Sequence, residues 1–245
     1  MVAEYLTITA HSGCEGTLRD SMASVHTGIL YGADVVEMDV RRDKSGSLVI
    51  SHNQREEYSG CALLSEVFDA AQAGNVRVNC DIKETEIVHD VLALAARKRL
   101  GEQITLSGSV TPDLLKADPA IVRRAAVHLN IEELLKEYCV KRFPNAELSK
   151  QAPWDVVQAH QEELSSKLGE LVEQSFTLGI QAVNLPYSGW ARQLFSFVYT
   201  MGVPISVWTV NDQEDMERLI SGGVLNLTTL NVRQALGVRK QLLGY

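Results

Sequence analysis

Five ionisable side chains stand near the ends of three short segments whose residues alternate in polarity. Successive side chains of a strand point to opposite faces, so each segment has one apolar face and one face that carries ionisable groups. Glu37 and Asp39, for example, share the face opposite Met38. If the segments are neighbouring parallel strands, their C-terminal ends meet at one rim. The residues that would meet there are His11, Glu37, Asp39, Asp81 and Lys83.

Three carboxylates around one pocket repel one another, and Lys83 supplies only one balancing positive charge. A bound divalent metal is the simplest remedy, and oxygen ligands favour Mg²⁺ or Ca²⁺ over zinc or copper. Three protein ligands would leave coordination positions for water or a substrate oxygen. The residues alone therefore indicate metal-assisted chemistry on an anion. They also fit simpler alternatives: an exposed Glu-x-Asp pair on an antiparallel sheet, structural histidines and a solvated lysine.

The elements that must position these residues alternate along the chain. Nine segments have the composition or alternation of strands, namely 5–11, 34–40, 47–52, 76–83, 103–107, 121–128, 180–185, 204–210 and 224–229. Most of them are separated by segments with helical spacing, namely 18–30, 63–73, 84–98, 131–141, 154–178, 190–201, 212–220 and 231–243. Repeated strand and helix units predict a parallel sheet with helical crossovers.

One pair of strands departs from this alternation, because residues 41–46 are too few for a crossover helix. The turn-like residues 43–46 predict an antiparallel hairpin over about 34–52, which would bring His52 alongside Asp39. Eight parallel strands then remain. They predict an α/β fold, a (β/α)8 TIM barrel with this hairpin at its C-terminal rim, over a single domain of residues 1–245. An open doubly wound sheet is the competing architecture.

The composition is that of a globular protein with a sizeable core. Of the 245 residues, 45% are hydrophobic and 22% charged, which argues against disorder. The net charge of −8 argues against nucleic acid or an anionic membrane surface as partner. No segment has the length of a membrane span, residues 1–9 lack signal-peptide features, and the four cysteines show no paired spacing. We expect no integral membrane association and a cytoplasmic location.

Several motifs resemble the glycerophosphodiester phosphodiesterase family over nearly the whole length. Residues 11–13 (H-S-G) correspond to its H-R-G, 32–40 (G-A-D-V-V-E-M-D-V) to its G-A-D-x-x-E-x-D-V, and 48–53 (L-V-I-S-H-N) to its V-V-x-H-D. Residues 78–83 (V-N-C-D-I-K) are similar to its N-x-E-x-K strand, and 207–211 (V-W-T-V-N) to its W-T-V-N strand.

The resemblance implies a (β/α)8 barrel that hydrolyses glycerophosphodiesters, small-molecule substrates, to an alcohol and glycerol 3-phosphate. It also implies the role of each matching residue. Glu37, Asp39 and Asp81 would hold a divalent metal, Mg²⁺ or Ca²⁺, and His11 and His52 would serve as general acid and base. Lys83, Trp208 and the position of Ser12 would lie on the substrate side, with Lys83 on the phosphate and Trp208 beside the glycerol or leaving group.

The sequence departs from the family pattern in five places. Ser12 replaces an arginine that contacts phosphate in the family, which predicts weaker phosphate binding or a different substrate. Asp20 stands where the family has a glutamate, and Asp81 replaces another. Residues 229–232 replace the family's T-D-x-P, and the short stretch after His52 predicts an open pocket with little or no insertion subdomain.

The sequence is compatible with three functions. The leading one is a metal-dependent phosphodiesterase that acts on a glycerophosphodiester or a similar small phosphodiester. A lyase that stops at a cyclic phosphate, as sphingomyelinase D-like relatives do, would use the same residues. A barrel that binds a phosphorylated ligand without turning it over is the third, although binding alone does not require both His11 and His52.

Overall fold

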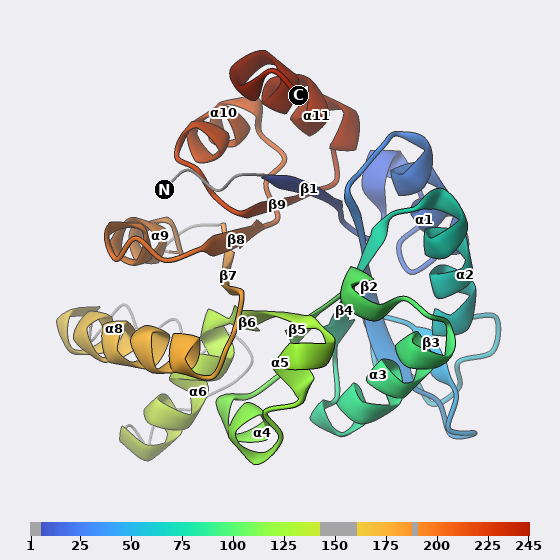
Figure 1. Cartoon of the computed structure of the whole chain (residues 1–245), viewed down its shortest axis with the longest axis horizontal. Helices are drawn as coiled ribbons and strands as arrows, with labels where there is room; N and C mark the ends of the chain where they lie inside the picture. The colour runs from blue at the N-terminus through green and yellow to red at the C-terminus, as the bar shows by residue number, and fades with distance from the viewer. Residues whose placement is uncertain (1–5, 143–160, 188–190) are drawn as a thin grey trace.

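The computed structural model of the chain describes residues 6–142, 161–187 and 191–245. Within these residues, eight parallel strands pair in the order β1-β9-β8-β7-β6-β5-β4-β2, and β1 also pairs with β2 to close the ring. The strands are β1 (Thr7–Ala10), β2 (Val35–Arg42), β4 (Arg77–Ile82), β5 (Ile104–Gly108), β6 (Ala126–Asn130), β7 (Ala182–Pro186), β8 (Ile205–Trp208) and β9 (Asn226–Thr229). Figure 1 shows this ring with the helices outside it. The predicted (β/α)8 barrel is confirmed, and the pairing of β1 with β2 excludes an open sheet.

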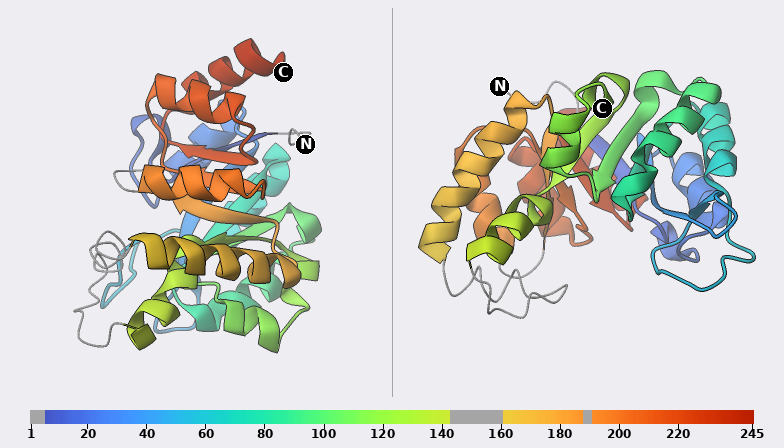
Figure 2. Two further views of the ribbon diagram at one scale, coloured as in Figure 1. Left: turned by 90° about the vertical axis from the view of Figure 1, so that its left-hand side faces the viewer. Right: turned by 90° about the horizontal axis from the view of Figure 1, so that it is seen from below.

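The helices lie alongside the strands and cover their outer faces (Figure 2). They are α1 (Met22–Leu30), α2 (Leu64–Gly74), α3 (Val88–Arg97), α4 (Pro112–Ala117), α5 (Ile121–Arg124), α6 (Ile131–Arg142), α8 (Gln161–Thr177), α9 (Ala191–Thr200), α10 (Gln213–Ser221) and α11 (Val232–Leu243). Three short 3-10 turns are η1 (Cys14–Gly16), η2 (Thr85–Ile87) and η3 (Gly101–Gln103). In the part of the chain that is described, no helix has both the length and the apolar character needed to cross a bilayer.

The hairpin predicted from the short connection is present. Strand β3 (Leu48–Ile50) runs antiparallel to β2 outside the ring, with Val40 opposite Ile50. The Asp43 carboxylate stabilises the turn by accepting from the backbone N–H groups of Ser45 and Ser47. After β3, residues 51–63 are all described and contain neither a helix nor a strand, as the predicted lack of an insertion subdomain requires.

The two faces of each barrel strand differ in polarity. The outward side chains form the core under the helices, as Val36, Met38 and Val40 do on β2. The inward face is unusually polar and includes the buried residues Thr9, Glu37, Asp39, Asn79, Thr105, Ser107, His128, Asn184, Ser206, Asn226 and Thr228. Many of these groups hydrogen-bond to an inward group of the neighbouring strand, since a buried polar group without a partner is costly. Asn226, for example, accepts from the Thr9 hydroxyl at 2.6 Å.

Some predicted boundaries differ from the structure. The helix expected over 18–30 begins only at Met22, because Ser21 caps it through a bond from the Ser24 N–H to the Ser21 hydroxyl. The strand expected over 121–128 is split into the short helix α5 and strand β6. Helix α4 was not predicted, although Thr111 followed by Pro112 is a helix start signal. Tyr5, Trp190 and the start of the helix predicted over 154–178 lie outside the described residues.

Candidate active site

Three carboxylates from two neighbouring strands meet at the C-terminal rim of the barrel. Glu37 and Asp39 are two residues apart on β2 and so point the same way, into the barrel. The parallel register of β2 and β4 sets Asp39 directly beside Asp81. Carboxylate oxygens of Glu37, Asp39 and Asp81 all lie within 4.8 Å of one another. The strand pairing therefore assembles the acidic cluster that the sequence predicted.

Lys83 sits between two of these carboxylates. It follows directly after β4, and its Nζ lies 2.6 Å from Oδ1 of Asp39 and also contacts Oδ2 of Asp81. Burial by itself would lower the pKa of Lys83, but the two carboxylates outweigh burial and raise it, so the ammonium stays charged. Lys83 is thus held by the acidic cluster at the edge of the cavity.

The three carboxyl groups differ in protonation because their neighbours differ. Burial, and next the negative charges of Asp39 and Asp81, raises the pKa of Glu37 well above its usual range. Burial also raises the pKa of Asp81, against the effect of Lys83. Burial would raise the pKa of Asp39 as well, but Lys83, Arg19 and His52 outweigh it and hold that pKa at about 2.

The cluster fits a hard divalent cation. Its donors are all carboxylate oxygens, and their mutual separation allows them to reach one ion. Positive charge at this point would let Glu37 and Asp81 ionise together, which burial and mutual repulsion oppose. The ligand atoms are therefore suited in type, spacing and charge to Mg²⁺ or Ca²⁺.

The two predicted histidines flank the acidic cluster. His11 follows strand β1, with its Nε2 3.8 Å from Oε2 of Glu37. Its Nδ1 is buried and has no hydrogen-bond partner among the described residues. Burial, and next the charge of Arg19, lowers the pKa of His11 to about 4, so the ring is neutral at pH 7. His11 therefore lines the cavity with an uncharged imidazole.

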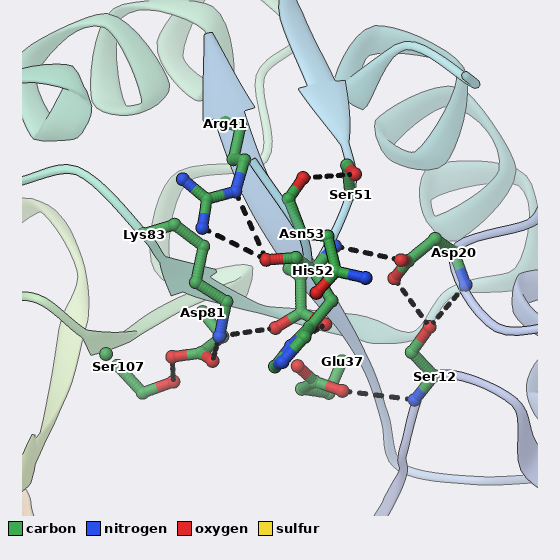
Figure 3. A network of polar contacts seen from close by, with 12 residues as sticks. Ser12, Asp20, Glu37, Arg41, Ser51, His52, Asn53, Asp81, Lys83 and Ser107 are labelled. Carbon is green, nitrogen blue, oxygen red and sulfur yellow. Dashed lines mark hydrogen bonds and ion pairs between the residues drawn. The ribbon is translucent and has the colours of Figure 1, made fainter. Parts of the chain in front are cut away.

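His52 is fixed by contacts to its backbone on both sides (Figure 3). Its carbonyl oxygen accepts from Nε and Nη2 of Arg41 at 3.2 and 3.0 Å, and its N–H donates to Oδ2 of Asp20 at 2.8 Å. The ring nitrogen Nδ1 lies 3.2 Å from Oδ2 of Asp39. The hairpin thus brings His52 alongside Asp39, as the short connection predicted.

Arg19 is a site residue that the sequence analysis missed. Its Nη2 lies 3.1 Å from Oδ2 of Asp39 and 2.9 Å from Nδ1 of His52. An arginine can only donate and a carboxylate can only accept, so Nδ1 of His52 accepts from Arg19 when it is unprotonated and donates to Asp39 when it carries a proton. Helical spacing assigned Arg19 to a helix, whereas residues 17–21 form a loop over the rim. The one available signal was the adjacent Asp20, which stands where the family motif has a glutamate.

The remaining two predicted residues lie in different places. Trp208 lines the cavity from β8, and its buried Nε1 has no hydrogen-bond partner in the described part of the chain. Ser12 is only 2% exposed and does not line the cavity. Its hydroxyl donates to Oδ1 of Asp20 at 3.3 Å and accepts from the Asp20 N–H at 2.8 Å. The Ser12 side chain therefore holds the loop of residues 17–21 through Asp20 and does not line the cavity.

The cavity has a polar floor that the sequence analysis did not predict. Besides the residues already named, it is lined by Asn79, Ser107, Asn130, Asn184 and Thr228. The same inward and outward alternation that identified Glu37 and Asp39 runs through the later strands and could have found these residues. The space at the rim, counted together with its open mouth, is about 460 Å³.

Gly108 is a further residue whose importance only the structure reveals. It ends β5 with a φ of +76°, and a Cβ at this position would collide with Oδ1 of Asp81 and the carbonyl oxygen of Ile82. Only glycine lets the β5 backbone pass so close to the Asp81 carboxylate.

Comparison with known proteins gives concordant results. The model of the glycerophosphoryl diester phosphodiesterase family matches residues 11–138, more than half of the chain. The Bacillus subtilis (strain 168) protein described as uncharacterized protein YqiK is 26% identical, over 91% of this chain and 93% of that protein.

Solved structures share the fold at low sequence identity. A glycerophosphodiester phosphodiesterase from Thermotoga maritima is 21% identical with a TM-score of 0.66, over 96% of this chain and 99% of that chain. A phosphodiesterase from Oleispira antarctica, solved in complex with the product sn-glycerol-3-phosphate, is 14% identical with a TM-score of 0.61, over 95% and 96% of the two chains.

Proposed function

Because this chain belongs to the glycerophosphoryl diester phosphodiesterase family and is thus a phosphoric diester hydrolase, we propose that it hydrolyses a glycerophosphodiester, or a similar small phosphodiester, with a bound divalent metal. The products are an alcohol and glycerol 3-phosphate. The observation that carries the proposal is the convergence of Glu37, Asp39 and Asp81 between two histidines at one rim. The complex of the Oleispira antarctica enzyme with sn-glycerol-3-phosphate supports a substrate of this size.

The carboxylates of Glu37, Asp39 and Asp81 would hold the metal, and Mg²⁺ or Ca²⁺ suits their oxygen donors. A bound dication supplies charge stabilisation to the phosphoryl oxygens as negative charge builds in the transition state. Lys83 stands at the edge of the same cluster and adds a second positive charge beside the phosphate. Trp208, on the β8 side of the cavity, would contact the glycerol or leaving group.

His11 and His52 divide the proton transfers in this proposal. The neutral His11 lines the cavity and accepts the proton of the attacking water or hydroxyl group. His52 donates a proton to the departing alkoxide, and Asp39 at 3.2 Å from its ring balances positive charge there. The bonds of Arg41 and Asp20 to the His52 backbone keep that ring in position through the reaction.

The test is turnover of a panel of glycerophosphodiesters with different alcohol groups. We expect hydrolysis that EDTA abolishes and that Mg²⁺ or Ca²⁺ restores. His11→Ala and His52→Ala should each lower kcat by about 10²-fold to 10⁴-fold, since each removes a general acid or base. His26→Ala is the matched control, because His26 is exposed on α1 outside the cavity. Activity that persists in chelator-treated His11→Ala protein would contradict the proposal.

Phosphorus NMR of the products separates two forms of the reaction. If a water molecule attacks, the spectrum shows a linear monoester from the start. If the neighbouring hydroxyl of the glycerol attacks, a cyclic ester appears first and is either opened or released. Calorimetric binding of the diesters without turnover of any panel member would instead indicate a barrel that only binds phosphorylated ligands.

A further inference from the structure

The cavity has two cationic side chains among the residues that line it, Arg19 and Lys83. Lys83 is 18% exposed and lies between two carboxylates. The side chain of Arg19 is 44% exposed and reaches the cavity from the loop of residues 17–21. The two cations therefore differ in how far they are free to meet an incoming anion.

We propose that Arg19 binds the phosphate group of the substrate, an inference that rests on the proposed phosphodiesterase function. Only its Nη2 contacts other described residues, namely Asp39 and His52. Nε and Nη1 have no partner in the described part of the chain, which leaves three of the five N–H groups of the guanidinium for an incoming anion. These donors are fixed in a planar fork and stay charged, so they suit phosphate oxygens better than a lysine ammonium does.

The loop that carries Arg19 is anchored at the adjacent residue. Asp20 has a φ of +56°, in the left-handed region that non-glycine residues rarely adopt. Its carboxylate accepts from the Ser12 hydroxyl and the His52 N–H, and its own N–H donates to Ser12. These bonds tie the loop to the ends of β1 and β3 together (Figure 3). Arg19 is therefore directed over the cavity by its neighbour and is not a loosely held surface side chain.

Ser12 has a defined part in this arrangement. Its side chain is 2% exposed and small enough to lie under the loop while it bonds Asp20 in both directions. A long side chain at position 12 would not fit that buried space without moving the loop. The small Ser12 side chain thus allows the loop to lie close to β1, and this loop position places the guanidinium of Arg19 at the cavity.

A competing role for Arg19 is to balance the charge of Asp39 alone. The two roles give different expectations for phosphate binding when Arg19 is removed. If Arg19 only balances Asp39, its removal strengthens metal binding and leaves phosphate binding unchanged. If Arg19 binds phosphate, its removal weakens phosphate binding, while metal binding is unchanged or stronger because one cation beside a ligand carboxylate has gone.

The experiment is isothermal titration of the metal-loaded protein with inorganic phosphate and with glycerol 3-phosphate, and of the chelator-stripped protein with Mg²⁺ or Ca²⁺ alone. We expect Arg19→Ala to weaken binding of both anions by about 10-fold to 100-fold, and Arg19→Lys to fall between Arg19→Ala and the wild type. Arg55→Ala is the matched control, because Arg55 lies on another exposed rim loop and outside the cavity.

A double-mutant cycle with Asp20→Ala tests the anchoring. Asp20 is a positioning residue, so Asp20→Ala should weaken phosphate binding in the wild type and have no further effect on it in Arg19→Ala protein. Phosphate affinity of Arg19→Ala within twofold of the wild type would overturn the inference. If Arg19→Ala is misfolded by circular dichroism, Arg19→Gln and Arg19→Lys carry the same comparison.

The inference and the proposed function fail in different ways. A wild-type protein that hydrolyses no diester of the panel refutes the function. A wild-type protein that hydrolyses them, with KM unchanged in Arg19→Ala, refutes the inference alone. A rise in KM and in the phosphate inhibition constant for Arg19→Ala, with Arg55→Ala unchanged, supports both.

Discussion

At the scale of single residues, two buried carboxyl groups of the same strand, Asp39 and Glu37, have pKa values shifted in opposite directions. Asp39 lies beside Lys83, Arg19 and His52, so its pKa falls to about 2 although it is buried. Glu37, two residues away on the same face, has the backbone N–H of Ser12 as its nearest donor and a raised pKa. If a dication binds here as proposed, Glu37 and Asp81 must lose their protons, and metal affinity should therefore rise with pH.

His128 allows a residue-scale prediction away from the active-site rim. It lies on β6, is 7% exposed, and places its Nε2 3.0 Å from Oε1 of Gln181. Burial lowers its pKa to about 4. The unfolded chain therefore binds a proton at this residue below about pH 6.5 and the folded protein does not, so stability is lost as the pH falls from about 6.5 to 4.

His128→Gln should remove this loss. The free energy of unfolding, measured by urea denaturation at pH 7 and pH 5, should fall by about 2 kcal/mol more in the wild type than in the variant. His26→Gln, which replaces an exposed histidine of α1, should keep the wild-type pH dependence. Equal pH dependence in His128→Gln and the wild type would show that His128 is protonated alike in both states.

At the scale of elements, the register between strands decides which inward side chains become neighbours, and the packing of the helices holds that register. Asp39 and Asp81 become neighbours because β2 and β4 pair in parallel, although 35–42 and 77–82 are far apart in the chain. Helix α1 approaches β1 and β2 closely on the outer face of the barrel. It does so at Gly28, where a Cβ would lie 2.8 Å from Cβ of Ala10 and 3.1 Å from Cγ1 of Val36.

Two glycine substitutions test this packing. Gly28→Ala should destabilise the protein by about 1–3 kcal/mol, because the extra methyl group overpacks the contact of α1 with β1 and β2. Gly237→Ala is the matched control within α11, where an added Cβ meets no atom within 4 Å. It should stabilise by about 0.5–1 kcal/mol through helix propensity. Urea denaturation of both variants provides the measurement, and a Gly28→Ala protein as stable as the wild type would contradict the packing argument.

At the scale of the whole molecule, the site joins segments from both halves of the barrel ring. The cavity is lined from β2, β4, β5, β6, β7, β8 and β9 and from the loops at the rim. A ligand that binds only the folded barrel therefore stabilises the entire ring by mass action. The carboxylates of Glu37, Asp39 and Asp81 are the point at which a dication would exert this effect.

Calorimetry gives the corresponding prediction. At a metal concentration of about 100 Kd, the free energy of unfolding should rise by about 2.7 kcal/mol, which corresponds to about 5–10 °C in Tm for a chain of this length. Asp81→Asn should lose most of this shift. Asp113→Asn, an exposed carboxylate of α4 that pairs with Lys116, should retain it. Equal metal-dependent shifts in both variants would place the metal elsewhere.

Local order along the chain is sufficient to predict several features of the site. The alternation of polarity within short segments identified the inward faces with Glu37, Asp39 and Asp81, and the six residues between two strands required the hairpin that carries His52. Such inferences succeed because a strand has a fixed two-residue period and a short connection allows few paths.

The tertiary structure alone decided which side chains from irregular segments reach the cavity. Helical spacing around Arg19 predicts a helix there, and the resemblance to the family places Ser12 on the substrate side because the family has a phosphate-contacting arginine at that position. Both positions are set by Asp20, whose bonds to Ser12 and His52 join segments that lie apart in the chain. Local patterns carry no record of such contacts, since the loop conformation depends on groups that only the closed barrel brings together.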